Sequence, residues 1–203
     1  MTYYERNLPH WQPEGATFFV TWRLFGSLPV QKRPALSARL RVSRNGRAAE
    51  GPLKTETPGE RFVRLDRELD RTAIGPHWLR IPSVADSVTN LILKGEKELG
   101  YFSLHAFVVM PNDVHLLMKP KIELRRIMNG IKGSTANAAN EILRRTGKPF
   151  WQDESFDHWV RTEKEFGNIF RYIEWNPVSA GLVRRPEDWV WSSARLGVTQ
   201  SVF

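Results

Sequence analysis

The feature that most restricts the fold is a pair of apolar segments joined by a turn signal. Residues 103–110 and 114–118 are apolar runs of strand length, separated by Pro111, Asn112 and Asp113. Proline presets its φ angle, and short polar side chains bond to the nearby backbone, so such residues favour tight turns. The two runs therefore predict adjacent antiparallel strands.

The segments around this pair alternate between extended and helical patterns. Residues 16–24 (ATFFVTWRL) and 156–161 have strand composition, whereas apolar residues recur at helical spacing in 83–99 and 122–145. A last helix begins at Thr162, with Glu165 at capping-box spacing, and Pro177 predicts its end near Asn176. The order predicts an α+β fold: a ferredoxin-like antiparallel sheet with helices on one face.

Length and composition predict one globular domain. The chain has 203 residues, of which 41% are apolar, which suits a single buried core. Residues 31–61 differ, because they are polar and basic with scattered glycine and proline. We expect one domain over residues 1–203 with a loop insertion at 31–61, which is either a solvated loop or a DNA-contacting arm.

Charge predicts a polyanionic partner. The chain carries 30 Lys+Arg against 22 Asp+Glu, a formal charge of +8, which favours nucleic acid or an acidic membrane surface. The absence of cysteine excludes disulfides and thiolate metal sites and fits a reducing compartment. We expect no signal peptide and no membrane span, hence a cytoplasmic protein.

Two short segments carry candidate chemistry. Asp113 and His115 are two residues apart at the start of a predicted strand, so their side chains lie on one face and can hold one divalent ion. Tyr172 and Asn176 are four residues apart on the last helix, at one border of its apolar stripe. Taken separately, a D-x-H strand is more often a polar pair at a sheet edge, and half-buried tyrosines are common at such helix borders.

Together the segments resemble a known family. The similarity extends through LPHW (8–11), TFFVTWRL (17–24), AFVVMPN (106–112), GKPFWQ (147–152), DHWVR (157–161), YIEWNPV (172–178), AGLV (180–183) and WSSA (191–194). In this combination the chain resembles the REP-associated tyrosine transposases, relatives of the single-tyrosine transposases within the HUH group of single-strand nucleases. Residues 31–61 have no clear counterpart in the pattern.

The resemblance implies roles for individual residues. Tyr172 is the expected nucleophile, and Asp113, His115 and Asn176 are the expected ligands of Mg²⁺ or Mn²⁺. Asp113 stands where the family has histidine. The implied activity is a metal-dependent single-stranded DNA endonuclease and strand transferase that acts on hairpin-forming repeats through a 5′-phosphotyrosine. The alternative is a non-catalytic DNA-binding protein on the same fold with a decayed metal site.

Basic residues around the second predicted helix are candidates for phosphate contacts or for a solvated helix face. They are Arg125, Arg126, Lys132, Arg144, Arg145 and Lys148. Trp175 is opposite the apolar stripe of the last helix, which suits either a second packing partner or an unpaired base. Charge alone also permits a structural RNA-binding protein, and monomer and homodimer remain equally open.

Overall fold

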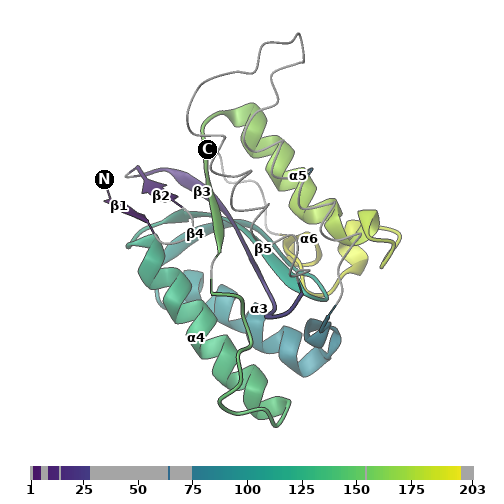
Figure 1. The fold of residues 1–203 in the computed structure, drawn as a ribbon. Coiled ribbons are helices and arrows are strands. Elements are labelled where there is room, and N and C mark those ends of the chain that lie inside the picture. Colours follow the sequence, from purple (N-terminus) through teal and green to yellow (C-terminus); the bar gives the residue numbers. More distant parts are fainter. Residues whose placement is uncertain are drawn as a thin grey trace, which may run out of the picture.

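The main sheet of the computed structural model has four antiparallel strands. Residues 2–5, 9–13, 15–27, 64, 75–153 and 155–197 are described. The strands are β3 (Thr17–Arg23), β4 (Phe102–Val109), β5 (Asp113–Pro120) and β6 (Phe156–Val160), in the order β4-β5-β3-β6. With one helix after β3 and one after β5, this is the split β-α-β pattern, so the predicted α+β fold is confirmed (Figure 1). The expected insertion at 31–61 lies outside the described residues.

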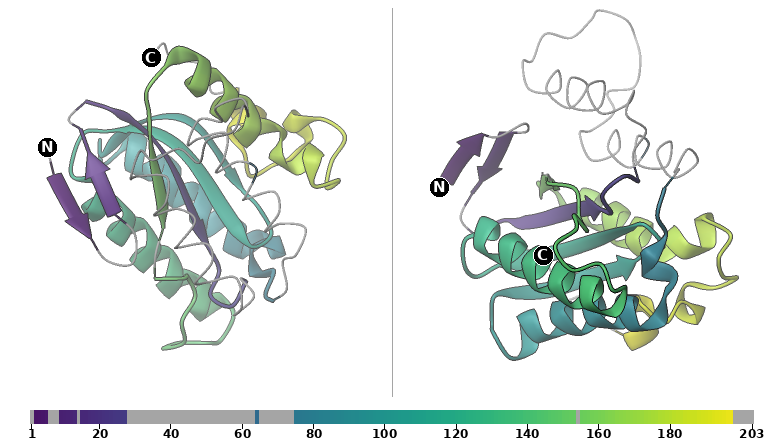
Figure 2. Two further views of the ribbon diagram at one scale, coloured as in Figure 1. Left: turned by 45° about the horizontal axis from the view of Figure 1, so that its top comes forward. Right: turned by 60° about the horizontal axis from the view of Figure 1, so that its bottom comes forward.

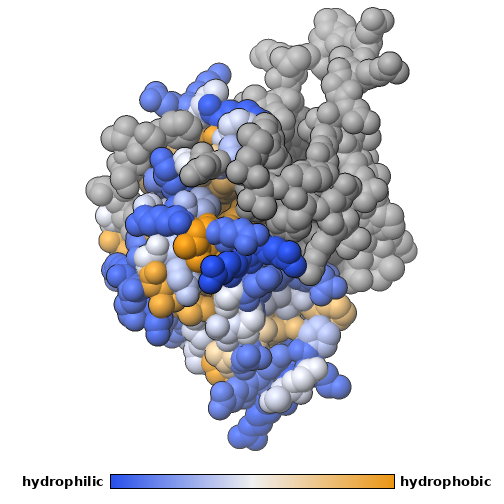
Figure 3. Space-filling model, turned by 90° about the vertical axis from the view of Figure 1, so that its left-hand side faces the viewer, coloured by the Kyte–Doolittle hydropathy of each residue, from blue (hydrophilic) through white to orange (hydrophobic). Residues whose placement is uncertain are grey.

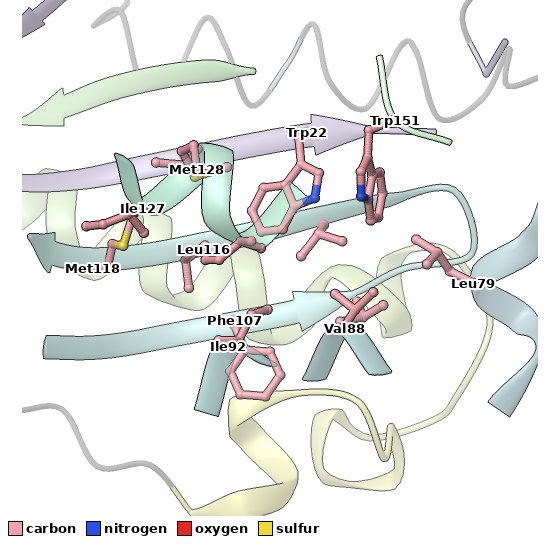
Figure 4. Packing of buried hydrophobic residues seen from close by; sticks show 14 of the residues in the cluster. Trp22, Leu79, Val88, Ile92, Phe107, Leu116, Met118, Ile127, Met128 and Trp151 are labelled. Carbon is pink, nitrogen blue, oxygen red and sulfur yellow. The ribbon is translucent and has the colours of Figure 1, made fainter. Parts of the chain in front are cut away.

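Two helices cover one face of the sheet. These are α3 (Pro82–Lys97) and α4 (Leu124–Ile142). Every second side chain of β3, namely Phe18, Val20 and Trp22, belongs to the larger core cluster that these helices share with the sheet. Trp22 packs beside Trp151 in this layer, with ring centroids 6.1 Å apart (Figure 4).

A third helix covers the opposite face, which corrects the expectation that all helices lie on one face. Helix α5 (Glu163–Ser179) buries Ile169 and Ile173 in a second cluster with Phe19 and Leu117. The sheet separates it from α3 and α4 (Figures 1 and 2). The physical reason is that β3 and β5 carry apolar side chains on both faces, so both faces require a covering layer.

The C-terminal part of the chain covers the outer edge of β4. The backbone N–H of Val109 donates to the carbonyl of Trp191 at 2.9 Å, and that of Phe107 donates to Ser193 Oγ at 3.1 Å. Such contacts protect an exposed strand edge from pairing with another chain. The segment contains two short helices, η3 (Pro186–Asp188) and α6 (Ser193–Leu196); a third, η2 (Trp78–Arg80), precedes α3.

The remaining described elements add little to the site. Strands β1 (Thr2–Glu5) and β2 (Pro9–Gln12) form a separate two-stranded antiparallel sheet. Across the described ranges, no helix combines the length and apolar character that a bilayer crossing requires.

Both ends of α5 bear on the predictions. Its start is confirmed, because the Glu165 N–H donates to Thr162 Oγ1 at 3.1 Å, as a capping residue requires. Its end is later than predicted: the helix continues through Pro177 to Ser179. Proline lacks only its own N–H, and the next turn still closes, since Ala180 donates to the Asn176 carbonyl at 2.9 Å.

Candidate active site

Two cross-strand pairs on β3 and β5 form the floor of the candidate site. The register places Thr21 opposite His115 and Arg23 opposite Asp113. Residues two apart on a strand share a face, so all four side chains lie on the face that α5 covers. Thr21 Oγ1 is 2.8 Å from His115 Nδ1, and Arg23 Nη2 forms an ion pair with Asp113 Oδ2 at 2.9 Å.

Helix α5 brings Tyr172 onto this floor. The rings of Tyr172 and His115 meet edge-on with centroids 5.4 Å apart, and Phe19 packs against both. Asn176, one helical turn after Tyr172, is also buried. The structure therefore brings together Asp113, His115 and Tyr172, three of the residues predicted from the sequence. The fourth, Asn176, lies on α5, the helix that also carries Tyr172.

The spacing of Asp113 and His115 is compatible with one divalent ion. Asp113 Oδ2 is 3.6 Å from His115 Nε2. Two donors that each lie about 2.1 Å from an ion are about 3.0–3.4 Å apart at tetrahedral or octahedral angles. Within the described ranges, no group of three or more His, Cys, Asp or Glu side chains is arranged to hold a metal ion.

Contacts at both ends attach α5 to its surroundings. Near its start, His158 on β6 is 2.9 Å from Glu165, which also accepts from the Arg161 N–H. Burial would raise the pKa of Glu165, but these hydrogen bonds and the neighbouring charges lower it overall. Near its end, burial raises the pKa of Glu174, against a hydrogen bond with the Ser193 side chain. These contacts hold Tyr172 in place over the sheet.

Sequence reasoning missed Thr21, Arg23 and the role of His158. The signal for the first two was present, since a T-x-R strand beside a D-x-H strand has matching polar positions with period two. It needed the register between two segments that are distant in the sequence, which local patterns do not supply. The partner of His158 could not be predicted, because it lies on a separate helix.

The family model described as "Transposase IS200 like" matches residues 82–176. That range contains Asp113, His115, Tyr172 and Asn176, whereas β3 with Arg23 lies outside it. A REP-associated tyrosine transposase of Haemophilus influenzae is 25% identical over 113 residues. The alignment covers 50% of this chain and 64% of that protein, so less than two thirds of the relative is spanned.

A solved structure agrees in fold. It is a REP-associated tyrosine transposase bound to a REP hairpin, with a TM-score of 0.51 and 17% identity, over 100% of this chain and 92% of that one. This chain is similar to the REP-associated tyrosine transposases in part of its sequence and in its fold. A transposase structure from Deinococcus radiodurans is less similar, with a TM-score of 0.33 and 15% identity over 78% of this chain and 88% of that one.

The helix that carries several of the predicted phosphate-contacting residues lies on the far side of the sheet from Tyr172. Helix α4, with Arg125 and Arg126 exposed, packs on the face of the sheet opposite Tyr172. The side of the molecule that carries α4 is mainly hydrophilic with scattered apolar residues (Figure 3). A DNA strand that contacts α4 therefore has to pass around the sheet to reach Tyr172.

Individual contacts distinguish these basic residues. Lys132 Nζ donates to the carbonyls of Gln152 and Asp153, both at 2.7 Å, and the Arg145 guanidinium stacks 3.7 Å from the centre of the Trp78 ring. Both therefore have structural partners, whereas Arg144 and Lys148 are exposed in the turn after α4. Phosphate binding by the six residues remains a prediction.

Trp175 is the exposed aromatic residue of the α5 outer face. Its side chain is 51% exposed, so the expected second packing partner is not provided by the described residues. Trp175 directly precedes the buried Asn176. Because the Trp175 ring is exposed, it is available to stack on an unpaired base.

Proposed function

We propose that this chain cuts and rejoins single-stranded DNA at hairpin-forming repeats, with Tyr172 as the nucleophile. The observation that carries the proposal is the contact of Tyr172 on α5 with His115 on β5, beside Asp113. A hairpin substrate is supported by the relative whose structure is bound to a REP hairpin. The net charge of +8 is consistent with a DNA partner.

In the proposed reaction, the Tyr172 hydroxyl oxygen attacks the scissile phosphorus. A bond forms between that oxygen and phosphorus, and the bond from phosphorus to the 3′ oxygen breaks. The proton lost by Tyr172 balances the proton gained by the new 3′-OH. The product is a 5′-phosphotyrosine, and because it retains a phosphodiester-type bond, a 3′-OH can attack it to rejoin DNA.

The proposed cofactor is Mg²⁺ or Mn²⁺, with Asp113, His115 and Asn176 as ligands. Bound there, the ion supplies positive charge to a non-bridging phosphate oxygen and makes phosphorus easier to attack. Thr21 contributes by holding His115 Nδ1, which leaves Nε2 directed toward Asp113. Because these side chains are buried, a phosphate reaches them only after neighbouring parts of the protein move apart.

The test of the nucleophile is the covalent adduct. Wild-type protein is incubated with Mn²⁺ and an end-labelled hairpin that has a single-stranded flank, and the products are separated on a denaturing gel. Tyr172→Phe should lose the protein–DNA adduct and retain hairpin binding, because only one hydroxyl is removed. Tyr101→Phe, a partly buried tyrosine before β4, is the matched control and should retain the adduct. An adduct in Tyr172→Phe would show that another residue attacks.

The second candidate is a non-catalytic DNA-binding protein on the same fold. The observation that favours it is the ion pair of Asp113 with Arg23, which already neutralises the carboxylate. Cleavage measured in Mg²⁺ and in Mn²⁺ separates the candidates. Wild-type cleavage that is lost in Asp113→Ala supports the enzyme. A wild-type chain that is inert in both ions, with activity restored by Asp113→His, supports the binding protein.

A further inference from the structure

One carboxylate oxygen lies at the junction of two interactions. Asp113 Oδ2 forms an ion pair with Arg23 Nη2 at 2.9 Å and is also the oxygen 3.6 Å from His115 Nε2. An ion held between Asp113 and His115 therefore uses the oxygen that Arg23 occupies. The guanidinium and a divalent ion carry like charges, so they compete for this oxygen.

Arg23 has a strong requirement for an anion. Its side chain is 7% exposed and that of Asp113 is 1% exposed. A buried guanidinium stays charged at any physiological pH, and its burial is costly unless an anion accepts its hydrogen bonds. If an ion weakens the contact with Asp113, a second anion at the same place becomes favourable.

A phosphodiester is the anion that suits this position. Its non-bridging oxygens match the planar donor fork of arginine and can accept two parallel hydrogen bonds. Arg23 is directly opposite Asp113 on β3, on the face over which Tyr172 lies. A phosphate presented to Tyr172 is therefore presented to the same side of the sheet as Arg23.

We propose that the Arg23 guanidinium binds the scissile phosphate. In the DNA-free protein, the Asp113 carboxylate holds this guanidinium instead. This inference rests on the proposed function and deepens it. Binding of the ion to Asp113 releases the guanidinium toward the DNA, and binding of DNA withdraws it from Asp113. By thermodynamic linkage, each ligand then increases the affinity for the other.

The test measures Mn²⁺ binding, with no cleavage required. Free Mn²⁺ is followed by electron paramagnetic resonance in titrations of the full chain carrying Tyr172→Phe, with and without the hairpin oligonucleotide. The variant Arg23→Gln removes the competing charge. Without DNA, we expect it to bind Mn²⁺ about 3- to 10-fold more tightly than the parent chain. Adding DNA should raise the Mn²⁺ affinity of the parent chain, and linkage effects of this kind are typically about 5- to 150-fold. The rise should be smaller in Arg23→Gln.

Two further variants keep the inference falsifiable. Arg23→Lys retains the charge and loses the planar fork, so Mn²⁺ affinity without DNA should stay at the parent level while hairpin affinity in Mn²⁺ falls. This variant also serves if Arg23→Gln does not fold. Arg185→Gln is the matched control, because Arg185 Nη2 is also 2.9 Å from a carboxylate, that of Asp188, in an exposed pair. It should change neither affinity.

The outcomes separate the inference from the proposed function. If Mn²⁺ binds the parent chain and both Arg23 variants retain the parent's affinities for Mn²⁺ and hairpin, Arg23 has no such role and the metal site stands. If Mn²⁺ binds none of the chains, the proposed metal site fails, and the inference about Arg23 fails with it.

Discussion

The buried ion pair between Arg23 and Asp113 should contribute much more to stability than an exposed pair of the same length. The contact is 2.9 Å long, and both side chains are almost fully buried. The charge centres lie farther apart than the contacting atoms, and charges about 4 Å apart attract by about 4 kcal/mol at an effective dielectric near 20. Removal of one partner from such a pair costs about 3–5 kcal/mol, because the other charge stays buried.

The perturbation is Arg23→Met, measured by urea unfolding at pH 7. We expect the free energy of unfolding to fall by about 3–5 kcal/mol, a large part of the roughly 5–15 kcal/mol of a typical domain. Adding Asp113→Leu should recover most of the loss, since the uncompensated charge is then gone. Arg185→Met, which breaks the exposed pair with Asp188, should have no measurable effect.

Two results would refute this reasoning. A loss of less than about 1 kcal/mol in Arg23→Met would mean that the pair behaves as a solvated one. Equal and additive losses from Arg23→Met and Asp113→Leu would mean that the two side chains are not energetically coupled.

Three further predictions concern other parts of the molecule. Burial, with the charge of Lys119, lowers the pKa of His105, so as pH falls the unfolded state takes up a proton before the folded state does. The free energy of unfolding should therefore decrease as pH drops below about 6.5. In urea unfolding between pH 7 and pH 5, His105→Leu should make this decrease smaller. Gly95→Ala should lower the midpoint of urea unfolding, because the added Cβ would lie 2.8 Å from the buried Phe102 ring. Gly130 has open space around it, so Gly130→Ala should raise the free energy of unfolding by about 0.5–1 kcal/mol. The logarithm of the hairpin association constant should fall against log salt with a slope of about −3 or steeper, at about −0.7 per phosphate contact, and a flat response in fluorescence anisotropy would exclude a phosphate-tracking surface.

Fold and site were predictable to different extents from the sequence. The turn at residues 111–113 and the apolar runs beside it correctly predicted the β4–β5 hairpin. The period of two placed Asp113 and His115 on one face, and the helical period placed Tyr172 and Asn176 at one border of α5. These are local properties, because a strand or helix repeats its geometry over a few residues.

The sequence by itself therefore determined the elements and which side chains share a face of each. Tertiary structure alone decided that α5 lies opposite α3 and α4, and that Arg23 faces Asp113 across two strands. The register between β3 and β5 depends on packing along the whole strands, and a shift of one residue would turn Arg23 to the other face. That Arg23 is the partner of the Asp113 carboxylate therefore depends on the pairing of two strands distant in the sequence, which local patterns do not predict.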